Sequence, residues 1–303
     1  MAGRRVDRDI VFGMYSGLAL LMDAHRPEDP NGLGLLFVGG SGWQSAPGWD
    51  AVGLKDKENQ LRPWLPHLVD AGYTVFAVNH RAAPRFPWPA ALEDLQRALR
   101  FVRARARDYG IDARRLGAVA GSSGAHLACM AALAAAPGAA GHPDPVEREE
   151  ATLQCLVLRE APTDLLAMAR EADEEGVAYV RAFMEGEPLA PLPDPAAYAE
   201  ASPLAQVRPG APPMLLIHGD ADSTVPFGQS LAMVEALAAA GTQTRLLRIP
   251  GGLHSPDFGA DGKPRPDWPD YIGETLDWLD RHLGAPPRRG RSGGPVHRPR
   301  TQE

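Results

Sequence analysis

Short runs of apolar residues alternate along the chain with longer segments in which apolar residues recur every three or four positions. Several runs are apolar at nearly every position, which is typical of strands covered on both faces. The runs predict strands at residues 9–12, 19–24, 34–38, 74–79, 116–120, 153–159, 214–218 and 244–249. The longer segments predict helices at residues 61–71, 89–109, 123–135, 227–240 and 269–283.

The order of these elements predicts an α/β fold. No helix separates the first two strands, which therefore predict a hairpin, and the later alternation predicts a mainly parallel central sheet flanked by helices. Residues 160–205 interrupt the alternation with acidic stretches, a cluster of prolines and a short helical pattern near 177–184, which indicates a small inserted cap. We predict one domain over residues 1–284, followed by a disordered Arg/Pro/Gly-rich tail at 285–303.

Composition narrows the class of protein. The 303 residues are 44% hydrophobic, which is enough for one large domain. A formal net charge of −7 gives no reason to expect nucleic acid or an anionic membrane as a partner. An arginine-rich tail that binds an acidic partner is an alternative, but a solvated tail is favoured.

Three features of the sequence predict a cytoplasmic location. No apolar run approaches the roughly 20 residues needed to span a bilayer, and the N-terminus lacks a signal-peptide pattern. The two cysteines, Cys129 and Cys155, lie in apolar runs, which indicates buried free thiols in a reducing compartment.

A candidate nucleophile follows the strand predicted at 116–120. This strand runs directly into Gly-Ser-Ser-Gly at residues 121–124 and then into a helix. Such a sharp turn lifts a serine hydroxyl above the sheet, at the positive end of the helix, and requires small residues two positions before and after it. Ser122 and Ser123 both meet this rule. A phosphate-binding turn is the alternative, but no GxxxxGK[ST] pattern supports it.

A candidate acid and base lie on later loops. Asp222 follows the strand at 214–218, and His254 follows the strand at 244–249. Carboxyl ends of parallel strands share one edge of the sheet, and serine, aspartate and histidine occur in the chain order of α/β-hydrolases. We expect His254 to accept the serine proton and to return it to the leaving group, while Asp222 orients the ring.

Other titratable residues have structural interpretations. Asp220 is expected to hold the acid loop by backbone hydrogen bonds or to replace Asp222. Asp164 is a weaker acid candidate that could instead cap the next helix. His80, His126 and His218 are expected to make structural contacts.

Glycines follow the strand predicted at 34–38. The sequence Gly-Gly-Ser-Gly-Trp at residues 39–43 exposes backbone N–H groups. Acyl transfer builds negative charge on a carbonyl oxygen, and loss of one fixed donor typically costs ~3 kcal/mol of transition-state stabilisation. The residue after the nucleophile supplies another donor.

As a set, these motifs resemble those of bacterial α/β-hydrolase carboxylesterases related to hormone-sensitive lipase and to acetyl-xylan or feruloyl esterases. The glycine loop, residues 78–94 and the acid loop at 218–226 are each similar to a family segment. The resemblance covers about residues 9–283. Aligning residues 115–128 with the family's nucleophile segment, without a gap, implies Ser122 as nucleophile.

The same alignment implies that the oxyanion donors are Ser41, Gly42 and Ser123. Two departures concern this region: Gly39 replaces the family's usual histidine, and a longer connection at 44–60 follows the loop.

The resemblance implies an α/β-hydrolase fold and a serine esterase that cleaves a small-molecule carboxylic ester through an acyl-enzyme. Its triad would be Ser122, Asp222 and His254, with no metal or organic cofactor. An amidase, arylformamidase or peptidase on the same triad is the alternative, and a non-catalytic binding protein of this fold is a further one. The sequence leaves ester and amide specificity and the oligomeric state open.

Overall fold

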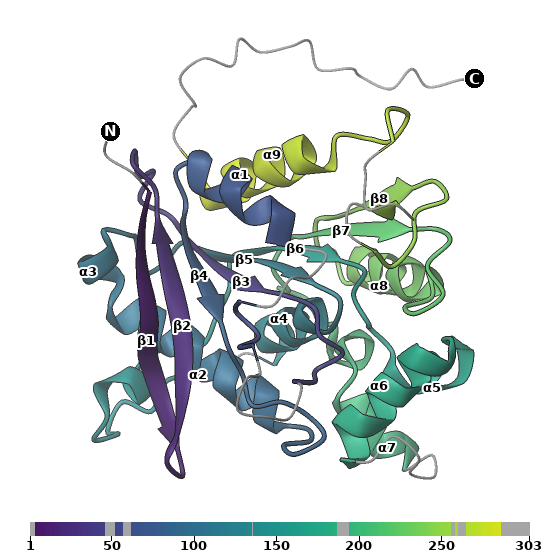
Figure 1. The fold of residues 1–303 in the computed structure, drawn as a ribbon, viewed down its shortest axis with the longest axis horizontal. Coiled ribbons are helices and arrows are strands. Elements are labelled where there is room, and N and C mark those ends of the chain that lie inside the picture. The colour runs from purple at the N-terminus through teal and green to yellow at the C-terminus, as the bar shows by residue number, and fades with distance from the viewer. Residues whose placement is uncertain are drawn as a thin grey trace.

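An eight-stranded sheet forms the centre of the computed structural model (Figure 1). The structure describes residues 4–45, 52–56, 62–134, 136–186, 194–255, 258–259 and 265–285. The strands are β1 (Arg5–Tyr15), β2 (Leu18–Arg26), β3 (Gly34–Val38), β4 (Thr74–Val78), β5 (Leu116–Gly121), β6 (Cys155–Arg159), β7 (Met214–Gly219) and β8 (Thr244–Ile249). Each strand predicted from the sequence is present, and β1 is longer than predicted.

The strand order is β1-β2-β4-β3-β5-β6-β7-β8. The β1–β2 and β2–β4 pairs are antiparallel, and all later pairs are parallel. Ser16 and Gly17 connect β1 to β2 with φ of 46° and 85°, the conformation that two-residue hairpin turns favour. The predicted hairpin is therefore confirmed.

Helices cover both faces of the sheet, as the strand–helix alternation predicts. They are α1 (Leu65–Asp70), α2 (Ala90–Ala104), α3 (Ala106–Tyr109), α4 (Ser123–Leu133), α5 (Leu165–Glu171), α6 (Glu174–Glu185), α7 (Pro195–Glu200), α8 (Gly228–Ala239) and α9 (Tyr271–Leu283). Short 3₁₀ helices lie at Arg62–Trp64, Pro145–Arg148 and Pro203–Gln206. Figure 1 shows α1 and α9 on one face and α2, α4 and α8 on the other.

Each face has its own apolar core. Leu36, Leu158 and Leu216 point into the core under α2 and α4, whereas Leu35, Val157 and Leu215 point into the core under α1 and α9. Neighbouring residues of one strand thus lie on opposite sides, which explains why the inner strands are apolar at nearly every position.

Helices α5, α6 and α7 lie between β6 and β7, in the segment where the sequence predicts an inserted cap. Each begins at an aspartate, Asp164, Asp173 or Asp194, whose carboxylate accepts a backbone N–H of the first turn. The alternative interpretation of Asp164 as a helix cap is therefore confirmed.

Three further predictions concern thiols, membranes and the tail. Cys129 and Cys155 are free and buried, as predicted. Within the described residues, no helix combines the length and apolarity that crossing a membrane requires. Residues 286–303 of the predicted tail, and most of the connection at 44–60, lie outside the part of the chain that the structure describes.

Candidate active site

The turn between β5 and α4 places Ser122 at its apex. Ser122 has φ 51° and ψ −128°, an unfavourable conformation for a residue with a side chain. Its N–H donates to Arg159 O at 2.8 Å, so the hydrogen-bond ladder to β6 holds the apex in place. A Cβ on Gly124 would lie 2.2 Å from Val38 O, so only glycine fits two positions after the apex.

Ser122, His254 and Asp222 lie in a hydrogen-bonded row at the carboxyl ends of β5, β8 and β7. His254 Nδ1 is 2.7 Å from Asp222 Oδ2, and His254 Nε2 is 3.0 Å from Ser122 Oγ. The carboxylate can only accept, so Nδ1 carries the proton and Nε2 accepts from the Ser122 hydroxyl. The second serine, Ser123, lies in the first turn of α4, where its Oγ accepts from Ser41 N at 2.9 Å.

The buried partners shift the pKa values of the acid and the base in opposite directions. Burial alone would raise the pKa of the Asp222 carboxyl, but hydrogen bonds from His218 and His254 outweigh it and hold the pKa below its ordinary value. Burial alone would lower the pKa of His254, but the charge of Glu160 and the bond to Asp222 outweigh it and raise that pKa. The site therefore favours a carboxylate beside a ring that can take up a proton.

The acid loop is held from several sides. Val225 N donates to the second oxygen of Asp222 at 2.8 Å. Asp220 accepts from Gly251 N at 2.6 Å and pairs with Arg248, which ties the acid loop to the histidine loop. The prediction that Asp220 holds the loop through a backbone hydrogen bond is therefore confirmed.

The other histidines of the core make structural contacts, as predicted. His218 donates to Val225 O and accepts from Ser230 Oγ. His126 donates to Ala201 O at 2.8 Å and accepts from Trp43 Nε1 at 3.1 Å, and burial lowers its pKa to about 4.

The glycine loop after β3 lies beside the Ser122 turn. Gly42 and Trp43 have φ of 61° and 58°. A Cβ on Gly42 would meet the Tyr179 ring of α6 at 2.5 Å, so glycine is required there for two reasons. Trp43 stacks on Phe183 of α6, with ring centroids 4.5 Å apart. Contacts of Trp43 thus brace the loop in which Gly39 replaces the family's histidine.

The three predicted oxyanion donors are close together in this arrangement. Ser41 N donates to Ser123 Oγ, which joins the glycine loop to the first turn of α4. The Ser41 amide therefore already has a partner within the protein. The Gly42 amide is the next one along the same loop. A bound carbonyl oxygen would have to share or displace the Ser123 hydroxyl to use the Ser41 amide.

Comparison with known proteins identifies the family. The BD-FAE family model matches residues 23–237, which is more than two thirds of the chain. The chain belongs to the BD-FAE family. This membership agrees with the carboxylesterase resemblance that the motifs predict, because several relatives of the BD-FAE chain are esterases by name.

Two curated relatives illustrate the similarity. Esterase LipQ of Mycobacterium tuberculosis is 30% identical over 266 residues, covering 85% of this chain and 59% of LipQ. Ethyl acetate hydrolase of Pseudomonas putida is 28% identical over 287 residues, covering 91% of this chain and 82% of that protein. The BD-FAE chain spans between about half and two thirds of the first mycobacterial relatives it matches.

Solved structures confirm the α/β-hydrolase fold of the BD-FAE chain. The acetyl ester-xyloside bifunctional hydrolase from Caldicellulosiruptor lactoaceticus superposes with a TM-score of 0.73 at 24% identity, covering 90% of this chain and 95% of that one. Est2, an esterase from Thermogutta terrifontis, superposes with a TM-score of 0.66 at 24% identity, covering 95% and 97%.

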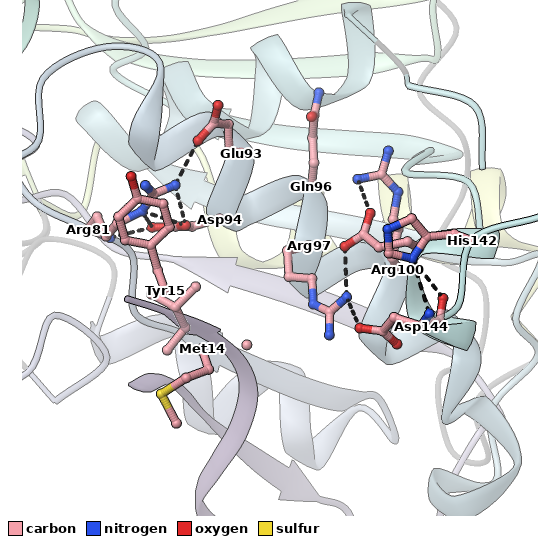
Figure 2. Close-up of a pocket in the computed structure, with 13 residues that line it drawn as sticks. Met14, Tyr15, Arg81, Glu93, Asp94, Gln96, Arg97, Arg100, His142 and Asp144 are labelled. Atoms are coloured by element: carbon pink, nitrogen blue, oxygen red, sulfur yellow. Dashed lines mark hydrogen bonds and ion pairs between the residues drawn. The ribbon is translucent and has the colours of Figure 1, made fainter. Parts of the chain in front are cut away.

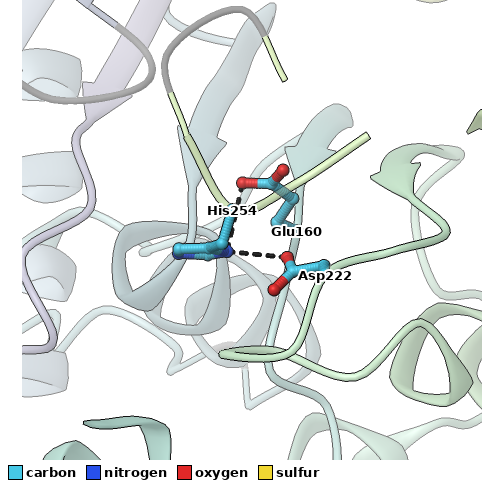
Figure 3. Close-up of side chains that lie close together, drawn as sticks. All are labelled: Glu160, Asp222 and His254. Atoms are coloured by element: carbon cyan, nitrogen blue, oxygen red, sulfur yellow. Dashed lines mark hydrogen bonds and ion pairs between the residues drawn. The ribbon is translucent and has the colours of Figure 1, made fainter. Parts of the chain in front are cut away.

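Sequence reasoning missed one residue of the site of this BD-FAE protein. Glu160 directly follows β6 and lies 3.2 Å through Oε2 from His254 Nδ1, on the same side as Asp222 (Figure 3). The hydrophobic pattern places residue 160 at the start of the inserted cap, where it predicts no site residue. Its position at the carboxyl end of an inner strand was the signal that could have identified it.

Glu160, Asp222 and His254 also form a candidate metal site by proximity. One ligand atom of each lies within 4.8 Å of the others. Both ring nitrogens of His254 already have partners, because Nδ1 faces the carboxylates and Nε2 faces Ser122. A metal ion at Nδ1 would displace its proton, so the donor set fits a proton carrier better than a metal centre.

A separate groove of about 560 Å³ lies between the β1–β2 hairpin and α2 (Figure 2). Its arginines are paired: Arg81 with Glu93 and Asp94, and Arg97 with Asp144 and Glu147. None of the three triad candidates lines it. These ion pairs attach α2 to the segment after β4 and to the 3₁₀ helix at Pro145–Arg148, and they do not extend the candidate active site.

Proposed function

We propose that this protein is a serine esterase that hydrolyses a small carboxylic ester through an acyl-enzyme. The observation that carries the proposal is the continuous row from Ser122 Oγ through His254 to Asp222, with both contacts at 3.0 Å or less. Esterase and ethyl acetate hydrolase are the names of relatives that share most of this chain. The same fold also serves amide hydrolysis, so the ester preference comes from the relatives.

The proposed reaction has two halves, the formation and the hydrolysis of the acyl-enzyme. Ser122, His254 and Asp222 take part in both. His254 Nε2 takes the proton of Ser122 Oγ as the oxygen attacks the substrate carbonyl, and the imidazolium then gives that proton to the leaving alcohol. A water molecule repeats the sequence on the acyl-enzyme and releases the acid. Asp222 keeps the Nδ1 proton in place and stabilises the imidazolium in both halves.

The proposed oxyanion site combines two elements. The amide of Ser123 lies at the start of α4, where the helix dipole favours negative charge. The glycine loop contributes the amide of Gly42. Ser41 supports this loop through its hydrogen bond to the Ser123 hydroxyl. Ser123 thus has one role through its backbone and another through its side chain.

Turnover of p-nitrophenyl acetate and butyrate tests the proposal. We expect the wild-type protein to hydrolyse both and Ser122→Ala to lower kcat by roughly 10⁴-fold or more, because a triad acts as a unit. Ser123→Ala is the comparison variant: it keeps the amide but removes the acceptor of the Ser41 N–H, so we expect a partial loss of activity that is far smaller than the loss in Ser122→Ala. Turnover that survives in Ser122→Ala and disappears in Ser123→Ala would assign the nucleophile to the other serine.

A fluorophosphonate probe separates an inactive protein from an unsuitable substrate. The wild type should be labelled at Ser122 whether or not the chosen esters fit. A parallel panel of aryl amides tests the amidase alternative. An unlabelled, inactive wild type would favour a binding protein of this fold.

A further inference from the structure

Glu160 combines two unfavourable features. Its side chain is 1% exposed, so its carboxyl group is removed from water. Its backbone has φ 51°, in the left-handed region that residues with side chains rarely occupy. Its N–H donates to Ile217 O at 2.9 Å, so the ladder between β6 and β7 fixes this conformation. The side chain is therefore held in one direction, toward His254.

Two carboxylates face one ring nitrogen. Asp222 Oδ2 is 2.7 Å from His254 Nδ1, and Glu160 Oε2 is 3.2 Å from the same atom. Figure 3 shows them approaching the ring from two different loops. Glu160 Oε2 makes no hydrogen bond among the described residues, so its contact with His254 Nδ1 is a contact between charges. The Nδ1 proton is hydrogen-bonded to Asp222, and the Glu160 carboxylate lies beside the same nitrogen.

A buried cation near His254 explains why a second carboxylate would stabilise the charged ring. Arg159 is fully buried, its Nη2 is 3.5 Å from Glu160 Oε1, and it donates to the carbonyl of Ser255 beside His254. Its guanidinium also lies 3.9 Å from the ring centroid of Phe258. A buried cation this close disfavours a charged imidazole, and it lowers the pKa of His254.

Glu160 offsets that cation when it is ionised: burial raises the pKa of its carboxyl, and the charges of Arg159 and His254 act in the opposite direction. With Glu160 and Asp222 ionised, protonation of His254 gives a cluster of two positive and two negative groups. Without Glu160, the same step leaves a net positive charge in a buried site. The other groups that face His254 are the Ser122 hydroxyl and, across Asp222 at 3.4 Å, the ring of His218.

We propose that Glu160 is a positioning residue that lies beside Nδ1 of His254, next to Asp222, and stabilises by its charge the imidazolium formed during catalysis. This inference rests on the proposed serine esterase mechanism for its effect on rate. Its effect on the His254 ring itself does not depend on any substrate. No bond to Glu160 forms or breaks, and the proton that Asp222 accepts remains on Nδ1.

Histidine-selective NMR tests the inference without turnover. The His254 signal is identified by its absence in His254→Gln, and its titration is compared between the wild type and Glu160→Gln. We expect the pKa of His254 to be lower in Glu160→Gln, because removal of a negative charge destabilises the imidazolium. Glu171→Gln removes an exposed carboxylate eleven positions along the chain and should leave the titration unchanged. An unchanged or higher pKa in Glu160→Gln would overturn the inference.

Kinetics test the effect on rate. A neutral His254 is required in the free enzyme, so the rise of kcat/KM with pH should move to lower pH in Glu160→Gln. We expect kcat to fall about tenfold, the size of the coupling between residues in direct contact. If the wild type hydrolyses no ester, the proposed function fails, while the NMR titration still decides the role of Glu160.

A double-mutant cycle with Asp222→Ala distinguishes an effect of Glu160 on His254 from a merely structural role. If both carboxylates stabilise the same imidazolium, Glu160→Gln should cost more in the Asp222→Ala protein than in the wild type. Equal costs in the two backgrounds would indicate a merely structural role. If Glu160→Gln does not fold, Glu160→Gly suits the positive φ and serves for the same measurements.

Discussion

Strained backbone at the ends of two neighbouring strands directs two side chains of the candidate site. Ser122 follows β5 and Glu160 follows β6, and both have φ 51°. In each case the residue's N–H continues the ladder to the next strand, to Arg159 O and to Ile217 O. The cooperative sheet therefore maintains conformations that would be unfavourable in an isolated turn. Both side chains consequently face His254.

A substitution of Gly124 tests how tightly the backbone is packed beside Ser122. A Cβ there would lie 2.2 Å from Val38 O and 2.7 Å from Gly39 O, and both are backbone atoms that cannot move alone. We expect Gly124→Ala to lower the free energy of unfolding by roughly 1–3 kcal/mol, the usual cost of overpacking. Esterase turnover should fall at least tenfold, because the shift displaces Ser122.

The matched control is Gly228→Ala at the start of α8, where a new Cβ meets nothing within 4 Å. Urea unfolding and p-nitrophenyl acetate turnover should be close to wild type for this variant. Equal behaviour of the two alanine variants would mean that the turn tolerates a side chain.

At the scale of the element, α6 connects two loops of the candidate site. Its N-cap, Asp173, accepts from Ser223 Oγ at 2.8 Å and Thr224 Oγ1 at 3.0 Å, directly after Asp222. Its last turns stack Phe183 on Trp43 of the glycine loop. One helix of the inserted segment therefore contacts both the acid loop and the oxyanion loop, and can set their separation.

Asp173→Ala tests this connection. The loss of the cap should lower the free energy of unfolding by about 0.5–2 kcal/mol at neutral pH. Release of the acid loop should also lower kcat several-fold. Asp194→Ala removes the equivalent cap of α7, where Asp194 accepts from Ala196 N, and should cost stability without lowering kcat. An equal effect of both variants on kcat would contradict a specific role of α6.

The stability difference in Asp173→Ala should depend on pH. Burial alone would raise the pKa of Asp173, but hydrogen bonds from Gly176, Ser223 and Thr224 outweigh it and lower the pKa. A lowered folded-state pKa means that the stabilisation is present above the ordinary aspartate pKa and is lost as pH falls through the folded value. Urea titrations at neutral and acidic pH should therefore show the difference shrinking on the acid side.

The sequence predicted α6 only in part, for a physical reason. Its apolar spacing near 177–184 marks the helix, but the helix begins at Glu174 and its contacts reach residues far away in the chain. Helices α5 and α7 have 7 and 6 residues, too few to establish a periodic pattern. The inner strands were predicted almost to the residue, because burial on both faces makes them continuously apolar.

At the scale of the whole molecule, the parallel sheet explains which site residues the sequence could identify. Loops after β5, β7 and β8 meet at one edge, so placing Ser122, Asp222 and His254 after strands predicted that they would approach one another. The steric rule for the turn allowed Ser122 and Ser123 equally, since it concerns only flanking size. To predict Glu160 as a site residue, one would have to know the direction of the side chain that follows β6. That direction depends on a φ angle that the pattern of apolar residues does not encode.

The two cysteines offer a test of whether both faces of the sheet unfold together. Cys129 lies in the core under α2 and α4, and Cys155 lies in the core under α1 and α9. Burial raises the pKa of the Cys129 thiol, and raises that of Cys155 to about 12, so neither is an available thiolate in the folded protein. We expect a thiol reagent to label neither in native buffer.

If residues 1–284 form one domain, as the sequence predicts, urea should expose both thiols in a single transition. Cys129→Ala and Cys155→Ala each leave one thiol to report on one face, and their labelling midpoints should coincide with the loss of circular dichroism once corrected for each variant's own stability. Labelling of one thiol at clearly lower urea would show that its core opens separately. In that case the helices on that face would form an independent cooperative unit, and the triad, whose loops leave the shared sheet, would be expected to lose activity with the first transition.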